Sequence, residues 1–125
     1  MDESLVFEVL RGDFVVCRVF RCGNSYKREF YGDRVDKCFC PLGDSESDIQ
    51  AFYKERSFDS GRPDLKVCLK ELGLFEYVPY DICRKTHGMF FYDDYWIRFP
   101  EDNSMSFDEA NKSLGLVRHG DECYE

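Results

Sequence analysis

The stretch that decides the fold is His87–Phe99, which reads HGMFFYDDYWIRF and contains the single tryptophan of the chain. Eight of its thirteen residues are aromatic or large and apolar, so we expect it to be buried, either in the chain's own core or in a partner. Asp93 and Asp94 interrupt it with two charges that prefer water. This pair indicates an exposed turn between two buried arms.

The sequence before this stretch predicts a sheet followed by helices. Residues 5–10 and 14–20 are apolar runs on either side of Arg11-Gly12-Asp13, which predicts a hairpin. Further strands are expected over residues 26–31 and 35–40. From residue 45 the apolar period changes to 3.6. Helices are therefore predicted after a cap at Ser45 or Ser47, from Pro63 to Gly73, and from Pro79 to Gly88.

After the acidic pair, residues 95–99 are predicted to form a strand, with Trp96 and Arg98 on one face and Tyr95, Ile97 and Phe99 on the other. Ser106 is expected to cap a last short helix over residues 107–113. The predicted fold class is α+β, a small antiparallel sheet of an amino-terminal meander plus one later strand, covered by three to four short helices. We expect one domain over residues 1–125, sheet-rich at 4–40, helical at 45–88, an aromatic strand at 89–99 and an acidic extension at 100–125.

The composition describes an ordinary folded domain. Of the 125 residues, 34% are charged and 43% hydrophobic, a balance typical of a globular protein with one core. Aromatic residues reach 17%, more than a small core needs, so two uses of the rings stay open, the core and an interface. No apolar run approaches the roughly 20 residues of a membrane span, and Asp2 and Glu3 carry the wrong charge for a secretory signal. A cytoplasmic protein is expected.

The negative charge is concentrated near the carboxyl terminus. The formal net charge is −8, with nine acids and three bases in residues 89–125 against sixteen and fourteen in residues 1–88. We expect such a field to attract basic partners and to repel phosphates. Direct binding of DNA or RNA is therefore not expected.

The sequence carries no recognisable catalytic or metal-binding pattern. Its seven cysteines are odd in number and unevenly spaced, which favours reduced thiols over a disulfide framework. Cys38 and Cys40, with Cys17 and Cys22, could in principle supply four zinc ligands, but buried free thiols fit their spacing better. His87 is interpreted as a residue of a helix end, and the phosphate-loop, kinase and hydrolase motifs are absent. We expect no enzymatic activity, no cofactor and no bound metal.

Several short segments between residues 40 and 99 share the pattern of a known family. They are Cys40-Pro41-Leu42-Gly43, Phe52-Tyr53-Lys54-Glu55-Arg56-Ser57, Gly61-Arg62-Pro63, Leu69-Lys70-Glu71-Leu72-Gly73-Leu74, His87-Gly88-Met89 and, most specific, Asp93-Asp94-Tyr95-Trp96-Ile97. Together they cover about half of the chain. In these segments the chain resembles the amino-terminal, HipS-like region of HipA-like toxin–antitoxin proteins from bacterial mobile elements.

In that family a small mixed domain precedes a serine/threonine kinase domain, and in some systems the small domain, HipS, is a separate chain that binds the kinase HipT and holds it inactive. A kinase domain does not fit in 125 residues, and its motifs are missing here. The resemblance therefore implies an antitoxin or regulatory subunit whose partner is a HipA-like kinase. The acidic extension and the cysteine-rich first half depart from the family pattern.

The leading hypothesis is a non-catalytic regulator or inhibitor that docks an aromatic patch on another protein. Its partner-binding residues are predicted to be Phe90, Phe91, Tyr92, Asp93, Asp94, Tyr95 and Trp96. The rings would act as anchors, and the two acids would pair with basic residues of the partner. The same rings could instead form the chain's own core, with the acids in a solvated turn, and the sequence leaves both uses open.

Two further hypotheses belong to other classes. An acidic anti-defence inhibitor, similar to an anti-CRISPR protein, would block a nucleic-acid-binding surface of its target with carboxylates placed where phosphates would lie. Beside Asp93 and Asp94, its acidic surface would consist of Glu101, Asp102, Asp108 and Glu109. A zinc-binding or redox protein would instead be built on the cysteines.

Overall fold

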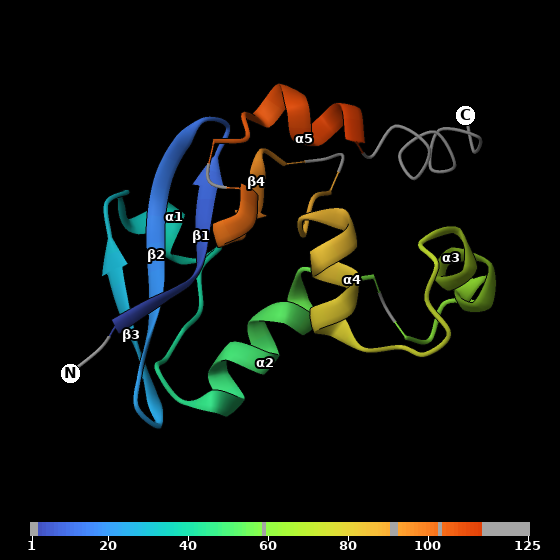
Figure 1. Ribbon diagram of the computed structural model, residues 1–125, viewed down its shortest axis with the longest axis horizontal. Helices are drawn as coiled ribbons and strands as arrows, with labels where there is room; N and C mark the ends of the chain where they lie inside the picture. The colour runs from blue at the N-terminus through green and yellow to red at the C-terminus, as the bar shows by residue number, and fades with distance from the viewer. Residues whose placement is uncertain (1–2, 59, 91–92, 103, 114–125) are drawn as a thin grey trace.

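The computed structural model describes residues 3–58, 60–90, 93–102 and 104–113. Its centre is a four-stranded antiparallel sheet with the strand order β3-β2-β1-β4 (Figure 1). The strands are β1 (Glu3–Arg11), β2 (Phe14–Cys22), β3 (Ser25–Phe30) and β4 (Tyr95–Arg98). The predicted α+β fold, an amino-terminal meander plus one later strand with helices around it, is confirmed.

The two turns of the meander each use a glycine in the left-handed region, Gly12 at φ 61° and Gly23 at φ 63°, where a side chain would be strained. Along β1, Phe7 and Val9 enter the main core, whereas Glu8 lies on the opposite face of the sheet. Strand β4 then pairs with the free side of β1. The last part of the sheet is thus supplied by the stretch that contains the tryptophan.

Helices cover both faces of the sheet unequally. Helices α2 (Glu46–Glu55) and α4 (Pro79–Thr86) pack on one face, where their apolar side chains complete the main core. Helix α5 (Phe107–Ser113) covers only one end of the other face. The remaining elements are α1 (Arg34–Lys37), α3 (Leu65–Glu71) and the 3-10 helix η1 (Pro100–Asp102). None of the helices in the described ranges has the length and apolar composition needed to cross a membrane.

The helix predictions are confirmed at their capping residues. Ser45 begins α2 with a capping box, because its hydroxyl accepts from the Asp48 N–H at 3.1 Å while the Asp48 carboxylate accepts from the Ser45 N–H. Ser106 and Glu109 exchange the same two bonds at the start of α5. Helix α3 begins at Leu65, two residues later than Pro63 had indicated.

The prediction of a strand over residues 35–40 is wrong. Asp33 and Asp36 form a capping box, in which each carboxylate accepts from the other residue's N–H, and this begins the short helix α1. The chain then turns through Cys38 to Cys40 without joining the sheet. Local side-chain bonds to the backbone outweigh the strand preference of the apolar residues here.

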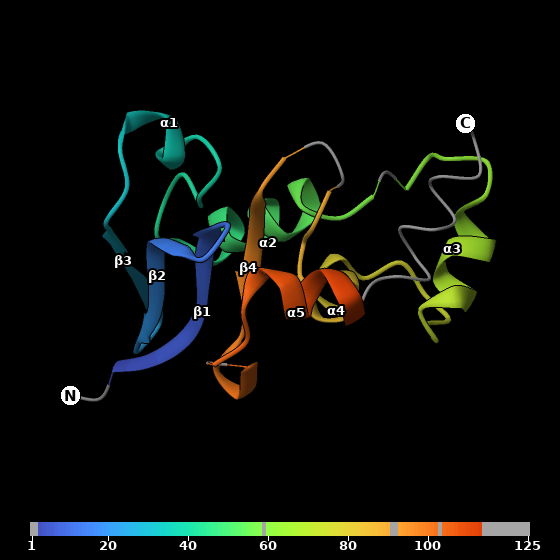
Figure 2. The same cartoon turned by 90° about the horizontal axis from the view of Figure 1, so that it is seen from above.

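Helix α3 lies at the end of the molecule away from β3, as both ribbon views show (Figure 1, Figure 2). Leu69 and Leu72 of α3 pack with Ile82 of α4 in a small cluster of their own. We call residues 62–82, which contain α3, the following loop and the first half of α4, the α3–α4 lobe. Its small separate core holds a loop at the surface, far from the sheet.

A buried carboxylate joins α1 to the sheet. Asp36 accepts hydrogen bonds from the Tyr95 hydroxyl at 2.6 Å and from the Arg11 guanidinium at 2.6 Å. Gly32 leaves room for this carboxylate, since a Cβ at residue 32 would lie 2.2 Å from it. Burial raises the pKa of Asp36, but the bonds from Tyr95, Arg11 and the Asp33 N–H outweigh it, so the pKa lies below its ordinary value.

Asp36 should therefore make the protein sensitive to acid. A carboxyl whose pKa is lower in the folded state stabilises the fold above its unfolded-state pKa, and this contribution is lost as the pH falls through the folded-state pKa. We expect the free energy of unfolding to fall between about pH 5 and pH 2, and Asp36→Asn to flatten this decline at a cost of about 1–3 kcal/mol at neutral pH. Urea unfolding across this pH range tests both; an unchanged slope in Asp36→Asn contradicts the role of this carboxylate.

Candidate functional site

The structure places two of the predicted anchors, Tyr95 and Trp96, inside the protein. Trp96 is 0% exposed and Tyr95 is 7% exposed, and they lie on opposite faces of β4 as the alternation of the strand predicts. Trp96 lies under α5 and donates from Nε1 to the Gly12 carbonyl at 2.6 Å. The expectation that these two rings anchor a partner is corrected: both are core residues, because a sheet strand with a helix on each face buries both of its sides.

The acidic pair divides between the interior and the surface. Arg56, at the end of α2, pairs with the Asp93 carboxylate at 3.1 Å and 3.2 Å and also donates to the carbonyls of Gly88 and Tyr95. Its guanidinium lies over the half-buried ring of Phe90, 4.7 Å from the ring centre. Asp93 and Phe90 are thus engaged within the chain, and Asp94 is exposed. Phe91 and Tyr92 lie outside the described residues.

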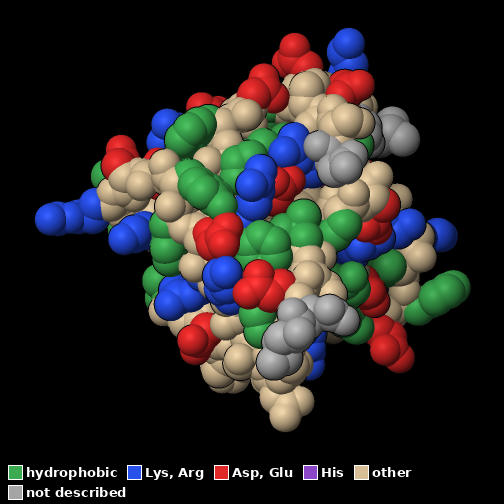
Figure 3. Space-filling view, turned by 60° about the vertical axis from the view of Figure 1, so that its left-hand side comes forward, with side chains coloured by type: hydrophobic (Ala, Val, Ile, Leu, Met, Phe, Trp, Pro, Cys, Tyr) green, Lys and Arg blue, Asp and Glu red, His purple; other side chains and the backbone are tan. Residues whose placement is uncertain are grey.

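Two of the four acids predicted to form an acidic surface have partners within the chain. Glu101 forms an ion pair with Arg84, and Glu109 completes the capping box of α5. Asp102 lies in η1 and is half-buried, and Asp108 is exposed on α5. Figure 3 shows one face of the molecule, on which acidic, basic and apolar side chains are interspersed. On that face no continuous acidic area is seen.

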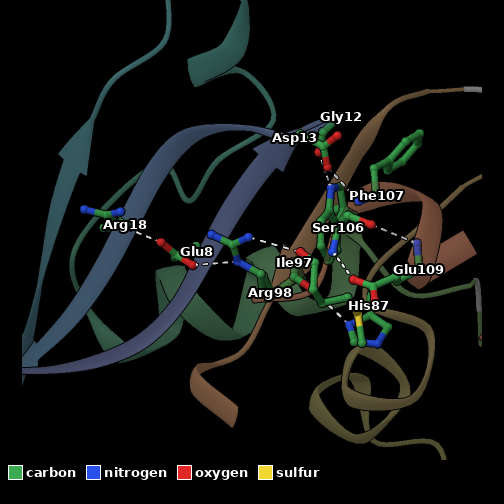
Figure 4. A network of polar contacts seen from close by, with 12 residues as sticks. Glu8, Gly12, Asp13, Arg18, His87, Ile97, Arg98, Ser106, Phe107 and Glu109 are labelled. Carbon is green, nitrogen blue, oxygen red and sulfur yellow. Dashed lines mark hydrogen bonds and ion pairs between the residues drawn. The ribbon is translucent and has the colours of Figure 1, made fainter. Parts of the chain in front are cut away.

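The face of the sheet opposite α2 carries a network of ion pairs around one buried carboxylate. Glu8 accepts from Arg18 at 2.8 Å and from Arg98 at 2.9 Å, and Arg98 also donates to the Met105 carbonyl just before α5 (Figure 4). Phe107 of α5 donates from its N–H to Asp13 in the first turn of the meander. These contacts fasten α5 to the sheet and give each carboxylate oxygen of Glu8 an arginine partner.

Three of the cysteines and His87 are buried parts of the fold. Cys17, Cys40 and Cys83 are buried, and burial raises the pKa of Cys83 to about 12. His87 ends α4 in the left-handed conformation and accepts from the Ile97 N–H through its carbonyl at 2.7 Å. Within the described ranges, no three His, Cys, Asp or Glu side chains are grouped so that they could hold a metal ion.

The α3–α4 lobe presents an apolar surface that the sequence did not reveal. Phe75, in the loop between α3 and α4, is 100% exposed, and the neighbouring Val78 is also exposed. Together with Leu74 they line a shallow hollow of about 290 Å³, to which the acidic residues Glu76 and Asp81 also contribute. A large exposed ring beside other apolar side chains is typical of a protein-binding surface.

The loop that carries Phe75 is fixed on both sides. Gly73 ends α3 at φ 78°, and the Leu74 N–H donates to the Leu69 carbonyl at 2.8 Å, a helix-ending pattern that turns the chain sharply. Two residues after Phe75, the Tyr77 hydroxyl donates to the Phe58 carbonyl at 2.9 Å. The backbone on either side of Phe75 is therefore fixed, which lowers the backbone entropy lost when this loop binds a partner.

Sequence reasoning missed Phe75 because a single ring in a short loop has no periodic pattern. The run Leu74-Phe75-Glu76-Tyr77-Val78 between a helix-ending glycine and a helix-starting proline is more apolar than a connecting loop requires. That surplus is the one available signal, and it does not say which ring faces outward. No protein-family model, curated protein or solved structure matches this chain.

Proposed function

We propose that the chain is a non-catalytic regulator or inhibitor that binds another protein through the α3–α4 lobe. The observation that carries this proposal is the complete exposure of Phe75 on a pinned loop. A protruding ring suits a pocket on a partner protein, whereas small-molecule sites are concave and enclose their ligand. The proposed contact surface consists of Leu74, Phe75 and Val78, with Glu76 and Asp81 at its rim.

The rim charges favour a partner with basic residues around an apolar pocket. Glu76 and Asp81 flank the hollow from the loop and from α4. Opposite charges on the partner would mainly set its orientation and its association rate, while burial of the Phe75 ring would supply affinity.

The resemblance supplies a candidate for this partner. We propose a HipA-like kinase that lacks this amino-terminal region, which the chain would hold inactive in the manner of an antitoxin. The matching segment Leu69–Leu74 forms the end of α3 and leads directly into Phe75. We also propose a cytoplasmic location, because the odd number of unevenly spaced cysteines favours a reducing compartment.

Replacing Phe75 by alanine should weaken binding without affecting the fold. With a HipA-like kinase from the same genome as the ligand, we expect a loss of about 2 kcal/mol, roughly a 30-fold higher Kd by calorimetry, and an unchanged melting curve. The matched control is Phe14→Ala, since Phe14 is 47% exposed on the hairpin turn and lies outside the lobe. The acidic-inhibitor hypothesis predicts instead that affinity falls steeply with salt.

Three outcomes decide the matter. Equal losses in Phe75→Ala and Phe14→Ala would contradict the lobe as the docking surface. A kinase that does not bind the parent chain would remove the proposed partner. An affinity that is unchanged in Phe75→Ala but falls with ionic strength would favour the acidic-inhibitor hypothesis.

A further inference from the structure

The two edges of the sheet are treated differently by the rest of the chain. Along the outer edge of β4, the Ile97 N–H donates to the His87 carbonyl, the Ile97 carbonyl meets the His87 Nδ1 at 3.2 Å, and the Tyr95 carbonyl accepts from Arg56. The segment at the end of α4 therefore closes this edge, and no further strand can be added there.

The outer edge of β3 is closed at one point only. In an antiparallel ladder, alternate residues direct both backbone groups to the same side. The Tyr26 N–H donates to the Asp44 carbonyl at 3.0 Å, away from β2. The backbone N–H and carbonyl groups of Tyr26, Arg28 and Phe30 therefore all point away from β2, toward the open edge. Within the part of the chain that the structure describes, the N–H and carbonyl groups of Arg28 and Phe30 have no hydrogen-bond partner. In the ribbon views β3 forms the outer side of the molecule (Figure 1, Figure 2).

We propose that this edge pairs with β3 of a second copy of the chain, antiparallel, with Arg28 of each copy opposite Phe30 of the other. This register uses the four unpaired groups of each strand and avoids Tyr26, whose N–H is already occupied by Asp44. In each copy β3 ends after Phe30, because the N–H groups of Tyr31 and Gly32 both donate to the Val16 carbonyl and α1 follows from Arg34.

The side chains beside the edge complement one another in this register. On the core side, Arg28 of each copy would lie opposite Phe30 of the other copy. Within a single chain, the Arg28 guanidinium lies 5.3 Å from the centre of its own Phe30 ring. On the other side the two Glu29 residues face each other across the symmetry axis, where like charges repel. The Nζ of Lys27 in the same chain lies 3.2 Å from the Glu29 carboxylate and offsets this repulsion, although the same Nζ is shared with Glu3.

The resulting dimer would contain one continuous sheet of eight strands. The α3–α4 lobe lies at the end of the molecule away from β3, so each lobe would stay free at its own end of the dimer. This inference does not depend on the proposed function, since it concerns a different surface and is read by oligomeric state rather than by kinase binding.

Sedimentation of the full chain tests the proposal directly. We expect the parent protein to sediment as a dimer and Arg28→Pro as a folded monomer, because proline is tolerated on an edge where its missing N–H would face solvent. A parent chain that stays monomeric at the highest soluble concentration overturns the proposal. A dimer that survives unchanged in folded Arg28→Pro also overturns it, and assigns the association to another surface.

A cysteine at the symmetry axis provides a second readout if Arg28→Pro does not fold. Facing residues in this position have Cα atoms about 4.5 Å apart, within disulfide range, so Glu29→Cys should form a covalent dimer on mild oxidation. In the matched control Lys27→Cys the two introduced thiols would be roughly 13 Å apart and should not join. Mass spectrometry identifies the linked peptide against the native cysteines. A covalent dimer of the Lys27→Cys variant, with none of the Glu29→Cys variant, would contradict the register.

Discussion

Replacing Trp96 by alanine should unfold the carboxyl-terminal side of the sheet rather than abolish docking on an intact protein. Trp96 is fully buried with Leu10 and Ala110, and removal of a buried indole typically costs about 3–5 kcal/mol. The variant also loses the bond from Nε1 to the Gly12 carbonyl and the ring on which Phe107 packs. We expect a large drop in the denaturant midpoint and an early loss of α5 from the sheet.

The comparison with two other variants separates packing from hydrogen bonding. Trp96→Phe keeps a ring in the cluster and loses mainly the bond to Gly12, so we expect a smaller loss, on the order of 1–2 kcal/mol. Phe75→Ala, at an exposed ring, should stay within about 0.5 kcal/mol of the parent. Chemical unfolding followed by circular dichroism measures all three. A Trp96→Ala variant with the stability of Phe75→Ala would mean that the indole is not a core residue.

The sheet was predictable because its signals are local. Glycines stand in both turns of the meander, and runs of β-branched and aromatic residues lie on either side of the first turn. The helices were predictable for a related reason, since Ser45 and Ser106 cap them and Pro79 begins α4. Turn and cap chemistry acts over three or four residues, and so it is visible in one sequence.

The segment over residues 35–40 shows where a short pattern misleads. Its apolar residues suggested a strand, but the capping box between Asp33 and Asp36 begins a helix of one turn. Asp36 is then held by Arg11 and Tyr95, which are distant in the sequence. A contact of this kind cannot be read from local periodicity, because the partners are brought together only by the fold.

The candidate site could be predicted only in part for the same reason. The sequence left open whether Trp96 is a core or an interface residue, and the helix that covers it, α5, begins eleven residues later. Arg56 lies at the end of α2, and its partner Asp93 comes 37 residues later in the sequence, so no local pattern reveals the pair. The exposure of Phe75 depends on the bonds that pin its neighbours.

Replacing Arg56 should cost more stability than replacing a typical charged residue of this protein. Both it and Asp93 are largely buried, and the guanidinium also satisfies the carbonyls of Gly88 and Tyr95. Truncation to alanine would leave a buried carboxylate and two carbonyls without their donor, and breaking such a pair typically costs about 3–5 kcal/mol. We expect the unfolding transition of Arg56→Ala to be broad and shifted to a much lower denaturant concentration.

The matched variant Arg56→Lys separates charge from geometry. Lysine keeps the positive charge but lacks the planar fork that reaches Asp93 and the Tyr95 carbonyl together, so we expect it to recover less than half of the loss. A double-mutant cycle with Asp93→Asn should give a coupling energy of about 1–3 kcal/mol, because the two side chains share one desolvated site. Urea unfolding of the four proteins supplies the cycle. Additive effects of the two substitutions would show that Asp93 is solvated and does not depend on Arg56. Asp93 would then be available to pair with a basic residue of a partner protein.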